Sequence, residues 1–290
     1  MSFDTALQIV HDFLEQQHER GLALRASAAA LARLAESPAS GGRSSRDAGA
    51  GGPSGVAAES ARSGVAGAPP SKSFSAGSKS FSAESKAARL AEIRPPILAC
   101  TKCPHLATSR TQVVFGVGNP DAELMFVGEA PGEDEDLQGE PFVGKAGQLL
   151  TRIIETMGFA RGDVYIANIL KCRPDMPPGE SGNRKPRADE MQTCLPYLRE
   201  QIEIIEPRAL VALGATAMEG LLGETAPMSR LRGRWHEFNG IPLMATYHPA
   251  YLLRNQALGE KRKVWEDMLM VLEKLGRPIS ERQRNFFLPK

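Results

Sequence analysis

Short apolar runs alternate with helical patterns through the second half of the chain. The runs cover residues 123–127, 164–170, 209–213 and 241–247, and the helical patterns cover 147–157, 188–205, 215–222 and 259–275. Runs of four to eight apolar residues are typical of buried strands, and their alternation with helices is typical of a parallel sheet. The pattern therefore predicts an α/β fold, a parallel sheet with helices on both faces.

The first ninety residues have a different character. Phe3, Leu7, Val10, Phe13 and Leu14 recur at helical spacing, whereas the following stretch is mostly Ser, Gly, Ala and Pro and repeats the hexapeptide SKSFSA. A stretch so poor in large apolar residues cannot bury enough surface to offset its ordering entropy. We therefore predict four segments: a short helical appendage at 1–36, a disordered linker at 37–92, a folded domain at 93–277 and a tail at 278–290.

Composition narrows the class of protein. The 35 basic residues nearly balance the 34 acidic residues, so any contact with DNA must come from local basic patches. The chain has no apolar run of about 18 residues and its start does not resemble a secretory signal. We expect a protein without membrane contact in a reducing cytoplasm, where four cysteines favour ligands, catalysts or core residues over disulfides.

Polar and glycine-rich segments follow the predicted strands. The first strand runs into GEAPGEDED (128–136), the second contains Asn168 and leads into KCRP (171–174), and the fourth runs into HPAYLLRN (248–255). Because ligands bind beyond the carboxyl ends of parallel strands, these segments predict one cleft at a single edge of the sheet.

One segment imitates a phosphate-binding loop. Residues 139–146 read GEPFVGKA, but Ala146 stands where a magnesium-binding Ser or Thr is needed. Four carboxylates, at residues 133–136, come just before it and would repel a triphosphate. We keep nucleotide hydrolysis only as a disfavoured alternative.

All four cysteines lie in the predicted domain. Cys100 and Cys103 have the C-x-x-C spacing of a chelating pair, Cys172 follows a strand, and Cys194 lies within a helix. Four thiolates suit either zinc or an iron–sulfur cluster, and the spacing alone does not choose between them. His105 is close enough in sequence to replace a cysteine, although a surface histidine is the simpler interpretation.

The quoted segments, in this order and with C-x-x-C upstream, resemble the family 4 iron–sulfur uracil-DNA glycosylases over about residues 93–277. The resemblance implies a three-layer α/β/α fold, a [4Fe–4S] cluster held by the four cysteines, and a monomeric, nucleoid-associated enzyme. Its activity would be excision of uracil from DNA, the start of base-excision repair. The alternative is an iron–sulfur or zinc module that binds DNA without chemistry.

Two departures from the family pattern stand out. The stretch DMPPGESGN (175–183) enlarges the loop between the third and fourth cysteines. A related branch that traps uracil-DNA covalently has glutamine in its first motif and a basic histidine-containing insert. This chain has Ala130 and lacks that insert, so the resemblance implies ordinary turnover.

The resemblance assigns uracil contacts to Glu129, Ala130, Phe142, Asn168 and His248. Asn168 suits uracil because its amide can donate to O4 and accept from N3–H, whereas cytosine presents the reverse pattern. Phe142 can stack on a flipped ring, and His248 can donate to O2 as charge develops there. Without the family match, each would more simply be a core or strand-end residue.

Catalysis also requires an anion near the sugar. The better-known glycosylase families place an aspartate where this chain has Ala130, so the neighbouring carboxylates are the candidates. We rank Glu129 first, because it is nearest the strand end, and Glu135 second. Together with His248 they form the predicted catalytic set.

DNA contacts are expected from two segments. Arg173 follows the second strand and Arg254 follows the fourth, where each can bind phosphate. Leu252, with its neighbour Leu253, can fill the space that the flipped base leaves. A solvated charged face explains any single arginine equally well.

The tail reads ISERQRNFFLPK and resembles the short peptides that dock repair proteins onto a bacterial sliding clamp. Gln283 would bond backbone while Phe286 and Phe287 fill an apolar pocket. The alternative is that both rings fold back onto the domain.

Overall fold

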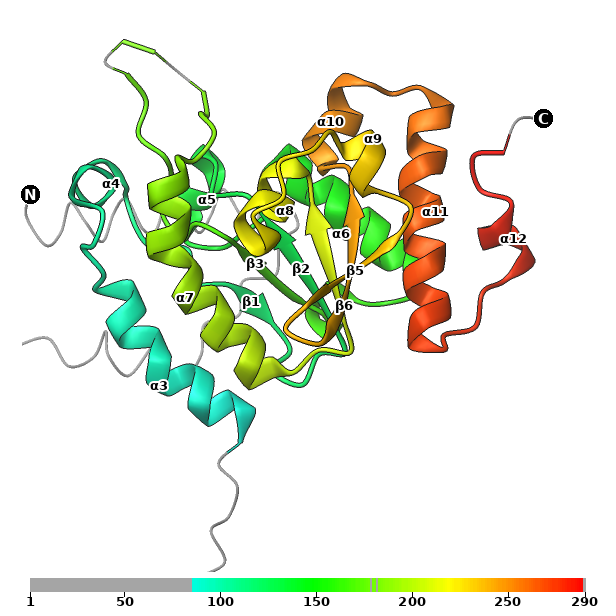
Figure 1. Cartoon of the computed structure of the whole chain (residues 1–290), viewed down its shortest axis with the longest axis horizontal. Helices are drawn as coiled ribbons and strands as arrows, with labels where there is room; N and C mark the ends of the chain where they lie inside the picture. Colours follow the sequence, from blue (N-terminus) through cyan, green and yellow to red (C-terminus); the bar gives the residue numbers. More distant parts are fainter. Residues whose placement is uncertain (1–84, 178, 181, 289–290) are drawn as a thin grey trace, which may run out of the picture. The chain divides into compact units, whose positions relative to one another are not determined.

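Six strands form one mixed sheet in the computed structural model, which describes residues 85–177, 179–180 and 182–288 (Figure 1). The strand order across the sheet is β1-β3-β2-β4-β6-β5. The bounds are β1 Val117–Gly118, β2 Leu124–Gly128, β3 Tyr165–Asn168, β4 Ala209–Leu213, β5 Trp235–Phe238 and β6 Ile241–Thr246. The four strands predicted from the apolar runs are β2, β3, β4 and β6, and they occupy the centre.

The four central strands are parallel, as predicted, and the two edge strands are not. β2 pairs in parallel with β3 and β4, and β4 with β6. β1 and β5 add antiparallel edges. Both were missed because β1 has only two residues and β5 reads WHEF, without an apolar run. The α/β fold class is confirmed, with a mixed sheet in place of a purely parallel one.

Helices cover both faces of the sheet. Their bounds are α3 Lys86–Leu98, α4 Pro104–Ser109, α5 Glu133–Gln138, α6 Lys145–Met157, α7 Ala188–Ile205, α8 Ala215–Leu222, α9 Met228–Leu231, α10 Pro249–Arg254, α11 Leu258–Leu275 and α12 Glu281–Arg284. Among these described helices, none is both long and apolar enough to span a bilayer.

Alternating strand residues divide the core into two layers. Met125 and Val127 pack with α3, α7 and α8, whereas Leu124 and Phe126 pack with α6 and α11. Figure 1 shows α3 and α7 on one side of the sheet and α11 on the other. The period of two along β2 thus builds the three layers.

The folded domain begins earlier than residue 93. Helix α3 starts at Lys86, capped by the Ser85 hydroxyl, which accepts from the Ala88 N–H at 3.2 Å. Lys86 Nζ donates to the Ile205 carbonyl of α7 at 2.7 Å, and Leu90 and Ile97 are buried. The predicted linker therefore ended too late, because α3 buries only two large side chains and reads as polar. The predicted appendage and the rest of the linker lie outside the described residues.

The C-terminal tail packs onto α11. Trp265 Nε1 donates to the Gln283 carbonyl at 2.6 Å, and the Phe286 ring meets the Trp265 ring edge-on at 5.5 Å. Gln283 Nε2 donates to the Thr156 carbonyl of α6 at 2.9 Å. Gln283 and Phe286 thus follow the fold-back alternative, while Phe287 stays 39% exposed.

Candidate active site

A small cavity lies at the predicted edge of the sheet, beyond the ends of β2, β3 and β6. Its volume is about 130 Å³. The residues that line it are Ala130, Gly132, Glu135, Phe142, Ala146, Asn168, Asn183, His248 and Ala250. Pockets for drug-sized ligands occupy roughly 300–1,000 Å³, so this one fits a single small ring.

Asn168 places an unpaired acceptor in this cavity. It is the last residue of β3 and is 2% exposed, and its Oδ1 has no hydrogen-bond partner among the described residues. Gly128 stands beside it on β2, where a Cβ would come within 2.4 Å of that oxygen. A buried unpaired acceptor costs about 1–3 kcal/mol, so the site is built for a ligand that donates there.

Phe142 forms a wall of the cavity in a constrained backbone conformation. Its φ is 56°, in the left-handed region, and its ring is buried. Arg161 Nη2 donates to the preceding Pro141 carbonyl at 2.7 Å. Gly147 allows the close approach of α6, because a Cβ there would lie 1.8 Å from the Phe142 carbonyl oxygen.

His248 faces Phe142 as a neutral hydrogen-bond donor. The ring centroids are 5.5 Å apart. His248 caps α10, and its Nδ1 accepts from the Ala250 N–H at 3.1 Å, so the ring proton is on Nε2. Burial, with a smaller effect from Arg254, lowers the pKa of His248 to about 4. Near pH 7 the imidazole therefore donates without carrying charge.

The two candidate carboxylates have different surroundings. Glu135 lines the cavity and accepts from three backbone N–H groups, those of Gly132 at 3.1 Å and of Val143 and Gly144 at 2.9 Å each. Glu129 is not among the lining residues. Burial raises the pKa of Glu129, against the opposing effects of Thr216 and Lys185. Glu135 thus holds the loops of the cavity together, and Glu129 lies to one side.

The four cysteines lie close enough together to affect one another's pKa values. Arg110 Nη1 donates to Cys172 Sγ at 3.0 Å, and the Lys171 N–H donates to Cys194 Sγ at 3.2 Å. Burial raises the pKa values of Cys103, Cys172 and Cys194, the last to about 12, and neighbouring cysteines add to it. Arg110 opposes the rise at Cys172, and Lys171 opposes it at Cys194. Without a bound cation these three side chains therefore favour the neutral thiol form.

The sulfur spacing distinguishes between the two metal alternatives. In the part of the chain that the structure describes, no three of the four sulfurs lie within 4.8 Å of one another. Thiolates on one tetrahedral zinc ion, with Zn–S bonds near 2.3 Å, would be about 3.8 Å apart. The residues present therefore fit a larger group, such as an iron–sulfur cluster, better than a single ion.

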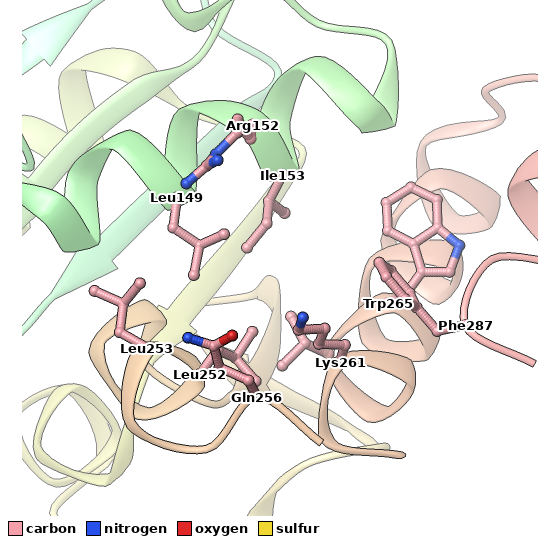
Figure 2. A pocket seen from close by; sticks show the side chains of 10 residues that line it. Leu149, Arg152, Ile153, Leu252, Leu253, Gln256, Lys261, Trp265 and Phe287 are labelled. Atoms are coloured by element: carbon pink, nitrogen blue, oxygen red, sulfur yellow. The ribbon is translucent and has the colours of Figure 1, made fainter. Parts of the chain in front are cut away.

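The three residues predicted to contact DNA differ in their exposure. Arg254 is exposed at the end of α10, and Arg173 Nη2 donates to the Gly182 carbonyl at 3.1 Å. Leu252 is only 5% exposed in the DNA-free chain, and its insertion into the DNA stack stays a prediction. Its neighbour Leu253 is 36% exposed. Figure 2 shows both leucines at a groove of about 440 Å³ between α6, α10 and α11.

Four of the lining residues were not assigned from the sequence, namely Gly132, Ala146, Asn183 and Ala250, and of these only Asn183 has a polar side chain. Asn183 belongs to the enlarged loop after Cys172, and its side chain lines the cavity. It lies beside Gly132, because a Cβ on that glycine would be 3.3 Å from Asn183 Nδ2. Its position, far from a strand end in a Gly- and Ser-rich stretch, gave no signal of this role.

Fold and site together define an α/β domain with a pocket for one planar ring and an adjacent four-thiol site. A family comparison matches residues 115–269 to the Uracil DNA glycosylase superfamily. A type-4 uracil-DNA glycosylase of Thermotoga maritima is 46% identical over 171 residues, which cover 58% of this chain and 85% of that protein. One of Archaeoglobus fulgidus is 43% identical over 180 residues, or 59% and 87% of the two chains. A type-5 uracil-DNA glycosylase of Pyrobaculum aerophilum is 29% identical over 189 residues, or 54% and 80%.

The chain belongs to the Uracil DNA glycosylase superfamily and, within it, to the type-4 uracil-DNA glycosylases. The family resemblance of its motifs is thereby confirmed.

Proposed function

We propose that this protein is a monofunctional glycosylase that flips uracil out of DNA and hydrolyses its N-glycosidic bond. The observation that carries the proposal is the unpaired Oδ1 of Asn168 in a cavity sized for one ring. Uracil supplies the missing donor through N3–H, and its O4 can accept from the Asn168 NH₂. Cytosine has no proton at N3, so it would leave Oδ1 unpaired.

Bond cleavage places negative charge on the uracil ring. His248 lines the cavity with its Nε2–H available, and that donor suits uracil O2. A fixed neutral donor stabilises charge that develops in the transition state without first attracting an anion to the site. Phe142, tilted 31° to the imidazole, provides the face on which the ring stacks.

We assign the anion that orients the attacking water to Glu135, ahead of Glu129. Glu135 lines the cavity, and its Oε2 accepts only one backbone N–H, which leaves a lone pair for water. Glu129 lies outside the lining residues, and its raised pKa weakens its charge. The order suggested by sequence proximity is thus reversed in this proposal.

A flipped base requires the duplex to be held and the gap to be filled. Leu253 and Arg254 are exposed side by side on α10, which begins one residue after His248. Leu253 can enter the stack while Arg254 and Arg173 bind phosphates on either side. We propose that the protein acts as a monomer on the DNA of the nucleoid.

We assign a [4Fe–4S] cluster to Cys100, Cys103, Cys172 and Cys194. The four-thiol set, of which no three described sulfurs lie within 4.8 Å of one another, supports this assignment, as does the Arg110 contact to Cys172. When bound, such a group supplies a positive centre that cross-links four thiolates. The hydrolysis itself transfers no electrons, so the chain's own residues carry its steps.

A sliding clamp stays a proposed partner of the tail. In the structure Gln283 and Phe286 are engaged with α6 and α11, so clamp binding would require both to leave the domain. A peptide covering 279–290 should then bind clamp more tightly than the full chain does. Equal affinity of the two would contradict a docked tail.

Release of free uracil from a synthetic duplex tests the proposed function. Wild-type protein should release uracil under single-turnover conditions and leave an abasic site. Binding of the same duplex without any released base would support the non-catalytic DNA-binding alternative instead.

A further inference from the structure

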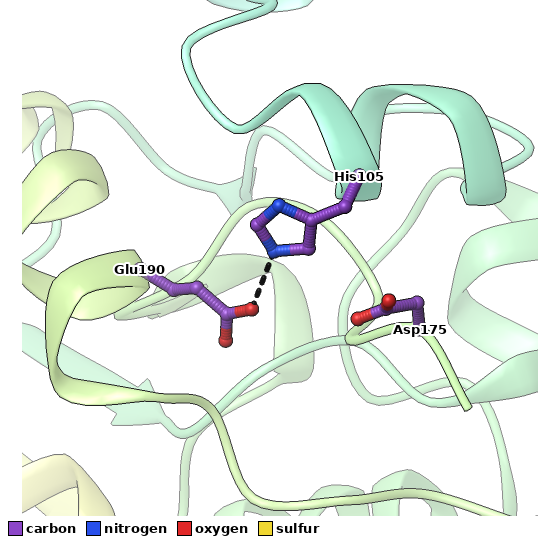
Figure 3. A group of neighbouring side chains, drawn as sticks. All are labelled: His105, Asp175 and Glu190. Carbon is purple, nitrogen blue, oxygen red and sulfur yellow. Dashed lines mark hydrogen bonds and ion pairs between the residues drawn. The ribbon is translucent and has the colours of Figure 1, made fainter. Parts of the chain in front are cut away.

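Glu190 is the centre of a buried ionic network. Its side chain is 0% exposed; its carboxylate lies 2.7 Å from His105 Nε2 and accepts from Arg184 at 2.7 and 3.0 Å. It also accepts from the backbone N–H of Arg187 at 2.7 Å. Figure 3 shows His105 and Glu190 joined, with Asp175 beside them; Arg184 in turn bonds Asp175.

The network joins the segments that carry the cysteines. His105 lies two residues after Cys103, on α4. Asp175 lies three residues after Cys172, in the loop that Arg184 closes by donating to the Asp175 carbonyl at 2.7 Å. Glu190 lies one helical turn before Cys194 on α7. One carboxylate therefore connects three segments that share no secondary structure.

Two guanidinium groups argue against a cation site among His105, Asp175 and Glu190. Arg184 bonds both carboxylates, and Arg187 Nη2 lies 2.7 Å from His105 Nε2. A metal ion would have to displace these positive groups from the same atoms. The cluster of side chains is thus an ion-pair network and its role is to hold segments together.

We propose that Glu190 is a positioning residue that sets the spacing of the four thiols and so controls how firmly the chain retains its iron–sulfur cluster. The inference rests on the proposed [4Fe–4S] cofactor. Removing a partner from a buried ionic network leaves the remaining charges uncompensated, so the three segments separate more readily. Residues that orient metal ligands typically change metal affinity by about 10–100-fold when replaced.

The test is the rate at which holoprotein loses iron to a chelator, followed by absorbance near 400 nm and by iron analysis. Glu190→Gln keeps the shape of the side chain and removes its charge, and it should lose iron roughly tenfold or more faster than wild type. Glu123→Gln is the matched control. Glu123 also pairs with two arginines, Arg208 at 2.9 Å and Arg277 at 2.7 Å, but at the amino end of β2. Its iron loss should match that of wild type.

A second variant separates positioning from general stability. Arg184→Met cuts the link to Asp175, and combined with Glu190→Gln it should add little, because both act through one network. If the variants lower the unfolding temperature of iron-free protein as much as that of holoprotein, Glu190 is only structural and the proposal is wrong. Equal iron loss from Glu190→Gln and wild type would also overturn it. Wild-type protein that holds no iron would instead refute the cofactor assignment.

Discussion

The cavity around Asn168 and the region that holds the four cysteines are built in different ways. The cavity is shaped by the backbone. Because Gly128 and Gly147 have no Cβ, Asn168 and Phe142 can approach them more closely than any other residue would permit. The cysteine region is held by charge, through Glu190 and through Arg110 on Cys172. The cavity should therefore respond to changes of size, and the cysteine region to changes of charge.

The largest expected effect within the cavity concerns its carboxylate. Glu135→Gln should lower the single-turnover rate of uracil release by about 10²–10⁴-fold, because the anion that orients water is lost. Glu129→Gln is the comparison and should cost much less, since Glu129 does not line the cavity. A larger loss from Glu129→Gln would return the role to that residue.

His248→Ala should slow the chemical step by about 10²–10³-fold while DNA binding changes little, because an oxyanion donor is removed. His248→Gln retains an N–H donor and should recover part of the rate. Single-turnover kinetics and duplex binding measured on the same samples separate the two effects. Equal losses in rate and in binding would make His248 a residue for positioning.

Gly147→Ala tests the sensitivity of the cavity to size. The new Cβ would lie 1.8 Å from the Phe142 carbonyl, so the wall must move by more than an ångström. Such a misplacement costs roughly 10²-fold in rate. Gly259→Ala in α11, where no atom lies within 4 Å, is the control and should be neutral. Iron loss should be unchanged in both, in contrast to Glu190→Gln.

Asn168→Asp should weaken discrimination against cytosine. The carboxylate cannot donate to uracil O4 but can accept from a cytosine amino group, a change of about 1–3 kcal/mol in relative preference. The ratio of base-release rates from matched U:G and C:G duplexes measures it. Asn239→Asp, in the exposed turn before β6, is the control. Unchanged uracil release and selectivity would leave Asn168 a structural residue.

The smallest effect is one of pH. Because the pKa of His248 is lowered from 6.5 to about 4, the folded chain takes up that proton later than the unfolded chain does. This contribution therefore destabilises the fold as pH falls from about 6.5 towards 4, where the unfolded state binds more protons. Denaturant unfolding at pH 7 and pH 5 should show a larger loss of stability in wild type than in His248→Gln. His248 should also cause no titration of the uracil-release rate near pH 6.5. The pH profiles of wild type and of His248→Gln should therefore have the same shape in that region.

The centre of the fold could be predicted because buried parallel strands read as apolar runs and their ends share one edge. The edge strands could not be predicted, since β1 has only two residues and β5 (WHEF) has no alternation of apolar and polar residues. Asn168, Phe142 and His248 line the cavity, and the family resemblance of their segments had singled them out. Asn168 ends β3 and His248 follows β6, whereas Phe142 lies in the loop between α5 and α6.

Other site properties depend on contacts between distant residues. Leu252 and Leu253 are adjacent in sequence, and only the packing of α10 decides which is buried. Asn183 reaches the cavity through the path of a loop, and Glu190 gains its role from His105, 85 positions away. No local pattern encodes either arrangement.

The most direct test of the central claim uses two isomeric bases as competitors of uracil release. 1-Methyluracil keeps N3–H, the donor that would bind the Asn168 oxygen. 3-Methyluracil has the same size and composition but lacks that donor. The structure predicts that 1-methyluracil inhibits roughly 10- to 100-fold better, the equivalent of one buried hydrogen bond. Equal inhibition by the two isomers would contradict a cavity organised around the unpaired acceptor of Asn168.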